Sequence, residues 1–101
     1  MSNFGLGMLG AFGLTDENRK LVVWAKGTII PGYDPATWRR DAFGSAIRYA
    51  DYGDRNSEHG WEIDHIVANA LGGSEDISNL RPLHFRNNAS LGGALAGLLK
   101  R

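Results

Sequence analysis

Two adjacent residues, Asp64 and His65, have side chains that are suited to hydrolytic chemistry. An aspartate carboxylate is a hard oxygen ligand of the kind that Mg²⁺ and similar cations prefer. A histidine exchanges a proton near neutral pH, so it is the residue best matched to activating a water molecule. On a β-strand, neighbouring side chains point to opposite sides of the backbone. We therefore expect Asp64 and His65 to perform two different tasks around one site, and not to form an Asp–His pair.

Asn79 and Asn88 follow His65 after fourteen and twenty-three residues. An asparagine before a strand can close a turn by bonding to nearby backbone, and one at the start of a helix can serve as its N-cap. A helix N-terminus also attracts phosphate through its free N–H groups and its dipole. Each asparagine therefore fits a structural role as well as a role in a site.

The remaining polar candidates have simpler interpretations. His84 fits a half-buried strand position where it bonds to backbone, with a place lining the site as the alternative. His59 fits an exposed loop. Four arginines could bind phosphate or could only make the surface soluble: Arg39, Arg40, Arg81 and Arg86. The tryptophans are predicted to lie in the core: Trp24, Trp38 and Trp61.

The elements that must position these residues lie in the second half of the chain. Residues 61–67 alternate apolar and polar side chains, which predicts a half-buried strand that carries Asp64 on its polar face. A glycine-rich turn follows, and residues 80–85 predict a second strand in which Pro82 marks an edge or a bulge. From residues 87–88 onward leucines recur at helical spacing, which predicts a helix with an asparagine cap.

The first half of the chain has weaker signals. Thr15 is a good N-cap and predicts a short helical turn, whereas residues 21–24 and 28–30 favour short extended segments. Together with the strand–strand–helix order of the second half, these signals predict an α+β fold with short flanking strands and helices.

Length and composition limit the function classes. A chain of 101 residues fits one domain, which we expect to span residues 15–101 after a flexible, glycine-rich arm at residues 1–14. The absence of cysteine excludes disulfides and thiolate zinc sites and fits a reducing, cytoplasmic compartment. No apolar run is long enough to cross a membrane. The net charge is zero, but every charged residue after Asp76 is basic, which keeps a nucleic-acid partner possible.

The run WEIDHIVANALGGSEDISNLRPLHFRNN at residues 61–88 resembles the HNH, or ββα-metal, nuclease motif. That motif runs Asp-His, a glycine-rich loop, Asn-Leu, and then a final His or Asn on the helix. The intervals in this chain are similar to those of HNH domains in CRISPR effectors. The run GYDPATWRRDAFGSAIRYADYG at residues 32–53 is similar to the lead-in of small stand-alone HNH proteins. The chain departs from the family pattern at Ala68 and Leu91, where Pro and Lys are common.

The resemblance implies an α+β fold with a ββα-metal motif at about residues 60–100. It also implies a metal-dependent endonuclease that hydrolyses DNA, with double-stranded DNA as the expected partner. His65 would be the general base, and Asn79 would orient the backbone near it. Asp64 and Asn88 would hold one divalent cation, expected to be Mg²⁺, with Mn²⁺ or another transition metal as alternatives.

Two alternatives remain open from the sequence. The chain could be a non-catalytic nucleic-acid-binding or interaction module that retains the HNH fold, or it could be a nuclease that is directed at RNA or acts as a toxin. A domain of this size has little surface for reading bases, so a protein partner could supply sequence specificity. The expected setting is intracellular, bacterial or phage-like.

Overall fold

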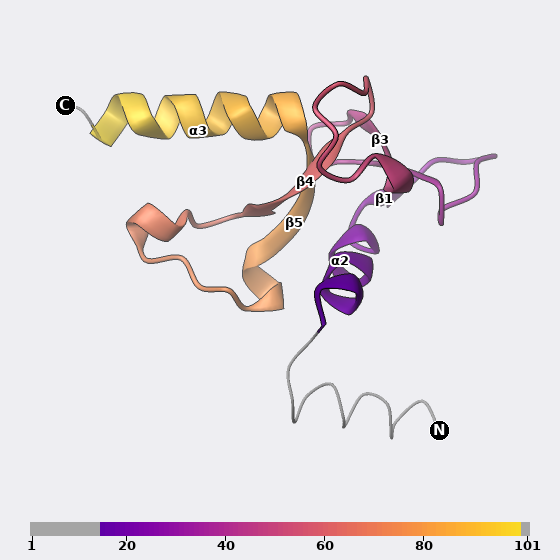
Figure 1. The fold of residues 1–101 in the computed structure, drawn as a ribbon, viewed down its shortest axis with the longest axis horizontal. Coiled ribbons are helices and arrows are strands. Elements are labelled where there is room, and N and C mark those ends of the chain that lie inside the picture. The colour runs from indigo at the N-terminus through magenta and orange to yellow at the C-terminus, as the bar shows by residue number, and fades with distance from the viewer. Residues whose placement is uncertain (1–14, 100–101) are drawn as a thin grey trace.

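The computed structural model describes residues 15–99, and this part of the chain has an α+β fold (Figure 1). The arm predicted at residues 1–14 lies outside the described residues, as do residues 100–101 and the side chains at positions 98 and 99. The helices and strands are α2 (Asp16–Trp24), β1 (Thr28–Ile29), β2 (Trp38–Arg40), β3 (Ala46–Arg48), β4 (Trp61–His65), β5 (Leu80–His84) and α3 (Phe85–Leu99). No helix within residues 15–99 is long and apolar enough to cross a membrane.

Helix α2 begins where the sequence predicted a cap. The Thr15 hydroxyl accepts a hydrogen bond from the backbone N–H of Asn18 at 3.1 Å, and acidic residues occupy the first turn. The extended segment predicted at residues 21–24 is wrong, because the helix continues to Trp24. Val23 and Trp24 are buried whereas Leu21 is exposed, so burial of one helix face in the core overrides the β-propensity of these residues.

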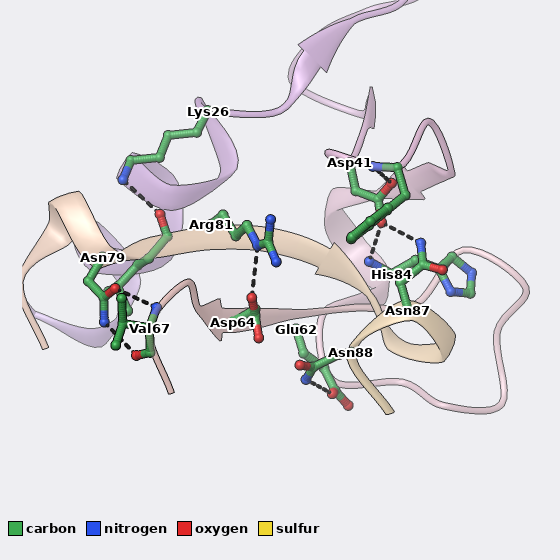
Figure 2. A network of polar contacts seen from close by, with 12 residues as sticks. Lys26, Asp41, Glu62, Asp64, Val67, Asn79, Arg81, His84, Asn87 and Asn88 are labelled. Atoms are coloured by element: carbon green, nitrogen blue, oxygen red, sulfur yellow. Dashed lines mark hydrogen bonds and ion pairs between the residues drawn. The ribbon is translucent and has the colours of Figure 1, made fainter. Parts of the chain in front are cut away.

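Strands β1, β2 and β3 form an antiparallel sheet, and the buried carboxylate of Asp41 joins it to the rest of the molecule. One carboxylate oxygen accepts backbone N–H groups of Phe43 and Ser45 in the turn that precedes β3. The other accepts the backbone N–H of His84 and the side-chain amide of Asn87, as Figure 2 shows. A single side chain thus links the first sheet to the junction between β5 and α3.

Strands β4 and β5 form an antiparallel hairpin whose continuous register pairs Trp61 with His84 and His65 with Leu80. Pro82 lies opposite Ile63 without a bulge, and the predicted edge position is confirmed because both strands of a two-stranded sheet are edges. The connection contains a close backbone approach: a Cβ at Gly73 would lie 1.6 Å from the carbonyl oxygen of Val67. Glycine is therefore required at this position.

The two faces of the hairpin contact different helices. On one face Trp61 is fully buried and its ring centroid lies 5.0 Å from that of Trp24 in α2. The other face carries Glu62 and Asp64, and α3 lies against it. The core positions predicted for Trp24 and Trp61 are confirmed, whereas Trp38 is only partly buried.

Helix α3 begins at Phe85, earlier than the sequence predicted. The Nδ1 atom of His84 accepts the backbone N–H of Arg86 at 3.1 Å, so a histidine and not an asparagine satisfies a free N–H at the helix start. The predicted N-cap role of Asn88 is therefore wrong. Its side chain instead projects from the first turn of α3 toward β4 (Figure 2).

Candidate functional site

Four of the predicted site residues line one hollow of about 360 Å³ between β4, the segment that follows it, and α3. These residues are Asp64, His65, Arg81 and Asn88. Apolar side chains complete the wall, among them Ile66, Leu91 and Leu95. The hairpin and the first turns of α3 thus bring together residues that are far apart in the sequence.

Asp64 is the last but one residue of β4, and its side chain is 13% exposed. Its register partner on β5 is Arg81, whose Nε donates to the Oδ2 atom at 2.8 Å (Figure 2). The Arg81 guanidinium also lies 5.5 Å from the ring centroid of Phe43. Arg81 is therefore an ion-pair partner inside the hollow, and only one oxygen of Asp64 is engaged by it.

The amide of Asn88 is oriented by Glu62, which lies on the same face of β4 as Asp64. Asn88 Nδ2 donates to Glu62 Oε1 at 2.8 Å, and Arg55 binds both oxygens of Glu62 at 2.7 and 2.9 Å. Arg55 first, and Asn88 after it, lower the pKa of Glu62 below its usual value. Because the amide nitrogen faces Glu62, the amide oxygen of Asn88 is left to accept a hydrogen bond or bind a cation.

His65 lies at the end of β4, and its side chain is 23% exposed. Its Nε2 atom lies 2.7 Å from Oε2 of Glu75 in the following loop. The hydrogen bond from His65 is the main cause that lowers the pKa of Glu75. Within residues 15–99, Nδ1 of His65 has no hydrogen-bond partner, so this nitrogen is open toward solvent or substrate.

Asn79 fixes the backbone that directly follows His65. Its Oδ1 accepts the N–H of Val67 at 2.8 Å, and its Nδ2 donates to the carbonyls of Val67 and Ser74 at 3.1 and 2.8 Å (Figure 2). The backbone N–H of Ile66 also donates to the Asn79 carbonyl at 2.8 Å. Asn79 therefore clamps the loop to the end of β4.

Lys26 also holds the segment that carries Asn79. Its ammonium group donates to the carbonyl of Leu80 at 2.7 Å and also to that of Ile77. Both carbonyls belong to the short helical turn and strand start around Asn79. A lysine from the chain's first half thus helps to place a loop in its second half.

His84 and Arg86 lie away from the hollow, at the other end of the hairpin. His84 is buried, and its Nε2 donates to the backbone carbonyl of Glu58 at 2.7 Å. The interpretation of His84 as a strand residue bonded to backbone fits this geometry, and the site-lining alternative does not. Arg86 lies 5.1 Å from the ring of Phe85 and does not line the hollow either.

Arg39 and Arg40 also have local partners and do not reach the hollow. Arg39 donates to the backbone carbonyls of Pro35, Ala25 and Gly27, which fixes the chain around β1 and β2. Arg40 donates to the carbonyl of Gly44. The phosphate track predicted through Arg39, Arg40 and Arg86 is therefore not brought together, and only Arg81 of the four arginines lines the hollow.

Sequence reasoning missed two carboxylates that contact site residues. Glu62 could have been found, because strict alternation along β4 places it on the face of Asp64. Glu75 could not, because it lies in an irregular loop where no periodicity predicts its direction. Their arginine partners, Arg55 and Arg19, lie outside the motif, and no local pattern predicts contacts with residues elsewhere in the chain.

The residues present fit a weakly held, hard divalent cation. Asp64 and Asn88 offer oxygen atoms to the same hollow, and the described part of the chain contains no cluster of three or more His, Cys, Asp or Glu side chains that could hold a metal. Mg²⁺ is commonly bound by one or two protein oxygens, with water and phosphate completing its shell. A closed structural zinc site needs four ligands, so the donor set does not fit one.

One family model matches this part of the chain. Residues 53–92 match the model described as HNH endonuclease. The matched segment contains β4, β5 and the first half of α3, and it includes the four predicted residues Asp64, His65, Asn79 and Asn88. The searches of curated proteins and of solved structures gave no match.

Proposed function

We propose that the chain is a metal-dependent endonuclease of the HNH family that hydrolyses DNA, because residues 53–92 match the HNH endonuclease model. The observation that carries the proposal is the convergence of Asp64, His65 and Asn88 on one hollow. These residues supply a proton acceptor and two oxygen ligands, which are the groups that hydrolysis of a phosphodiester needs.

In this proposal His65 is the general base. Its Nδ1 accepts a proton from a water molecule while the water oxygen forms a bond to phosphorus. The bond from phosphorus to the 3′ oxygen breaks and this oxygen takes up a proton from solvent, which gives 5′-phosphate and 3′-hydroxyl ends. Nε2 contacts Glu75, and Asn79 holds the backbone that follows His65. Nδ1 is therefore the ring nitrogen that has no hydrogen-bond partner within residues 15–99. A positioned base of this kind contributes roughly 10²- to 10⁴-fold to a reaction rate.

Asp64 and Asn88 would hold the cation, which we expect to be Mg²⁺. When bound, a divalent cation offsets the negative charge that develops on the phosphate and on the departing oxygen. Glu62 keeps the Asn88 amide turned so that its oxygen is presented, and Arg81 engages one oxygen of Asp64 while the other oxygen is left for the cation. Arg81, as the arginine that lines the hollow, is the candidate to contact a phosphate there.

The substrate we propose is duplex DNA that is bound with little sequence specificity. Three of the four arginines considered for phosphate contacts have partners elsewhere, and the hollow is walled largely by apolar side chains. A surface of this size and charge reads few bases, so specificity would come from a protein partner.

Cleavage of supercoiled plasmid tests the proposal. The purified chain is incubated with plasmid in Mg²⁺, in Mn²⁺ and in EDTA, and nicked and linear products are quantified. We expect cleavage with either metal and none in EDTA. Plasmid that is retarded on a gel but never cut, under any metal, would instead support the non-catalytic binding module.

A further inference from the structure

His65, Glu75 and Arg19 form a continuous chain of side-chain contacts across three parts of the molecule. His65 Nε2 lies 2.7 Å from one oxygen of Glu75, and Arg19 in α2 donates to the other oxygen at 3.0 Å. Glu75 is 65% exposed, so burial does not determine where its carboxylate points. Its direction is set by its side-chain partners, His65 and Arg19 among them.

We propose that Glu75 is a positioning residue for His65, which fixes the orientation of the imidazole and keeps the ring proton on Nε2. This inference rests on the proposed function, in which Nδ1 of His65 accepts the proton from water. Glu75 itself would touch neither substrate nor metal.

The chemistry of the two groups supports this role. A neutral imidazole has one N–H donor and one acceptor nitrogen, whereas a carboxylate can only accept. A contact of 2.7 Å with the carboxylate therefore requires the proton on Nε2, which leaves Nδ1 as the acceptor. A charge-assisted hydrogen bond of this length also resists rotation of the ring. During the reaction the carboxylate would stay hydrogen-bonded to the imidazolium that forms.

Arg19 explains how an exposed loop carboxylate can hold a fixed direction. It belongs to α2, which is attached to the core through Val23 and Trp24, so the salt bridge connects the loop to a rigid helix. Arg19 also places a positive charge beside Glu75. That charge offsets the repulsion that a lone carboxylate would exert on an approaching phosphate.

NMR of the metal-free protein tests the contact independently of activity. At mildly alkaline pH, where histidine is neutral, long-range ¹H–¹⁵N correlations report which ring nitrogen of His65 carries the proton. We expect the wild type to show a protonated Nε2, an unprotonated Nδ1 and an observable Nε2–H proton. Glu75→Ala should lose that proton signal and show a mixture of tautomers. Identical His65 spectra in the two proteins would overturn the proposal.

Kinetics test the consequence. Glu75→Ala should lower kcat by on the order of tenfold or more, with KM and the metal requirement unchanged, and Glu75→Gln should recover part of the loss because its amide oxygen can still accept. Asp76→Ala is the matched control, because it removes the same charge from the next position and its side chain has no hydrogen bond within the described residues. Asp76→Ala should cleave like the wild type.

The outcomes separate this inference from the proposed function. A wild type that does not cleave DNA contradicts the nuclease, whereas the NMR comparison still decides the contact between Glu75 and His65. Cleavage by the wild type, none by His65→Ala, and wild-type turnover by Glu75→Ala would overturn the positioning role while the nuclease stands.

Discussion

At the scale of single residues, each polar side chain in the hollow has one partner that holds it and one atom left over. Asp64 is held by Arg81, Asn88 by Glu62 and His65 by Glu75. The atoms left over are those that a water, a cation or a phosphate would use. The types and spacing of the site residues predicted this set, and strand alternation places Glu62 on the face of Asp64. Glu75 was not predictable, because the direction of a loop side chain depends on the folded backbone.

Asn79→Ala should destabilise the protein and lower its activity. The side chain makes three hydrogen bonds to the backbone around Val67 and Ser74, and removal leaves those groups unpaired. We expect the free energy of unfolding to fall by about 1–3 kcal/mol in a denaturant titration. Asn56→Ala, in an exposed loop where the side chain has no hydrogen bond within the described residues, should leave stability unchanged. Equal stability of the two variants would show that Asn79 is only a loop residue.

Arg81→Gln should strengthen binding of Mn²⁺ to the metal-free protein. The guanidinium occupies one oxygen of Asp64 and places a positive charge beside the proposed cation, and both effects oppose metal binding. Isothermal calorimetry should show a Kd lower by roughly threefold or more. Arg40→Gln removes the same charge from a side chain that, within residues 15–99, is hydrogen-bonded only to Gly44, and it should bind like the wild type. Weaker binding by Arg81→Gln would contradict the assignment of Asp64 as a ligand.

At the scale of elements, the second half of the chain was more predictable than the first, where the Thr15 cap and the short strand at residues 28–29 were predicted but the extent of α2 was not. Alternation in residues 61–67 and helical spacing after residue 88 come from burial of one face of an element, and such patterns are local. The segment at residues 21–24 has β-prone residues but forms a helix, because Val23 and Trp24 pack against Trp61 from a distant strand. Tertiary packing of this kind leaves no local signal.

The start of α3 was misplaced for a related reason. Two of the free N–H groups at the start of α3 have identified acceptors. The N–H of Arg86 donates to the His84 side chain, and the N–H of Phe85 donates to the carbonyl of Gly60, a residue far away in the sequence, at 3.1 Å. Asparagine is the stronger statistical cap, but the cap in use depends on where the hairpin ends. The shift moves Asn88 from a cap to a position that faces Glu62 and the hollow.

Asp41→Ala should show that the first sheet stabilises the hairpin–helix unit. The carboxylate accepts four hydrogen bonds, from the β3 turn, from β5 and from α3, and its removal leaves buried donors unpaired. We expect a loss of roughly 3 kcal/mol or more in chemical denaturation, together with reduced cleavage. Asp34→Ala removes one hydrogen bond in an exposed turn and should cost less than about 1 kcal/mol. A similarly small loss for Asp41→Ala would contradict the linking role.

At the scale of the whole molecule, the first half of the chain supports a site that lies in the second half. Lys26 and Arg19 reach the loop that carries Glu75 and Asn79, and Asp41 reaches the junction of β5 and α3. The family match begins at residue 53, so it does not include these three supports. The sequence motif therefore predicted the site's chemistry, but the contacts that fix its geometry span more than forty residues and could not be predicted from a local pattern.

The cleavage rate of a labelled DNA duplex by the wild type and by His65→Ala, each at saturating Mg²⁺ under single-turnover conditions, tests the central claim most directly. His65 contributes a proton acceptor and is not a proposed metal ligand, so its loss should leave the fold and Mn²⁺ binding intact. We predict metal-dependent cleavage by the wild type that leaves 5′-phosphate ends, and a rate roughly a hundredfold or more lower in the variant. Cleavage by His65→Ala at the wild-type rate would contradict this claim.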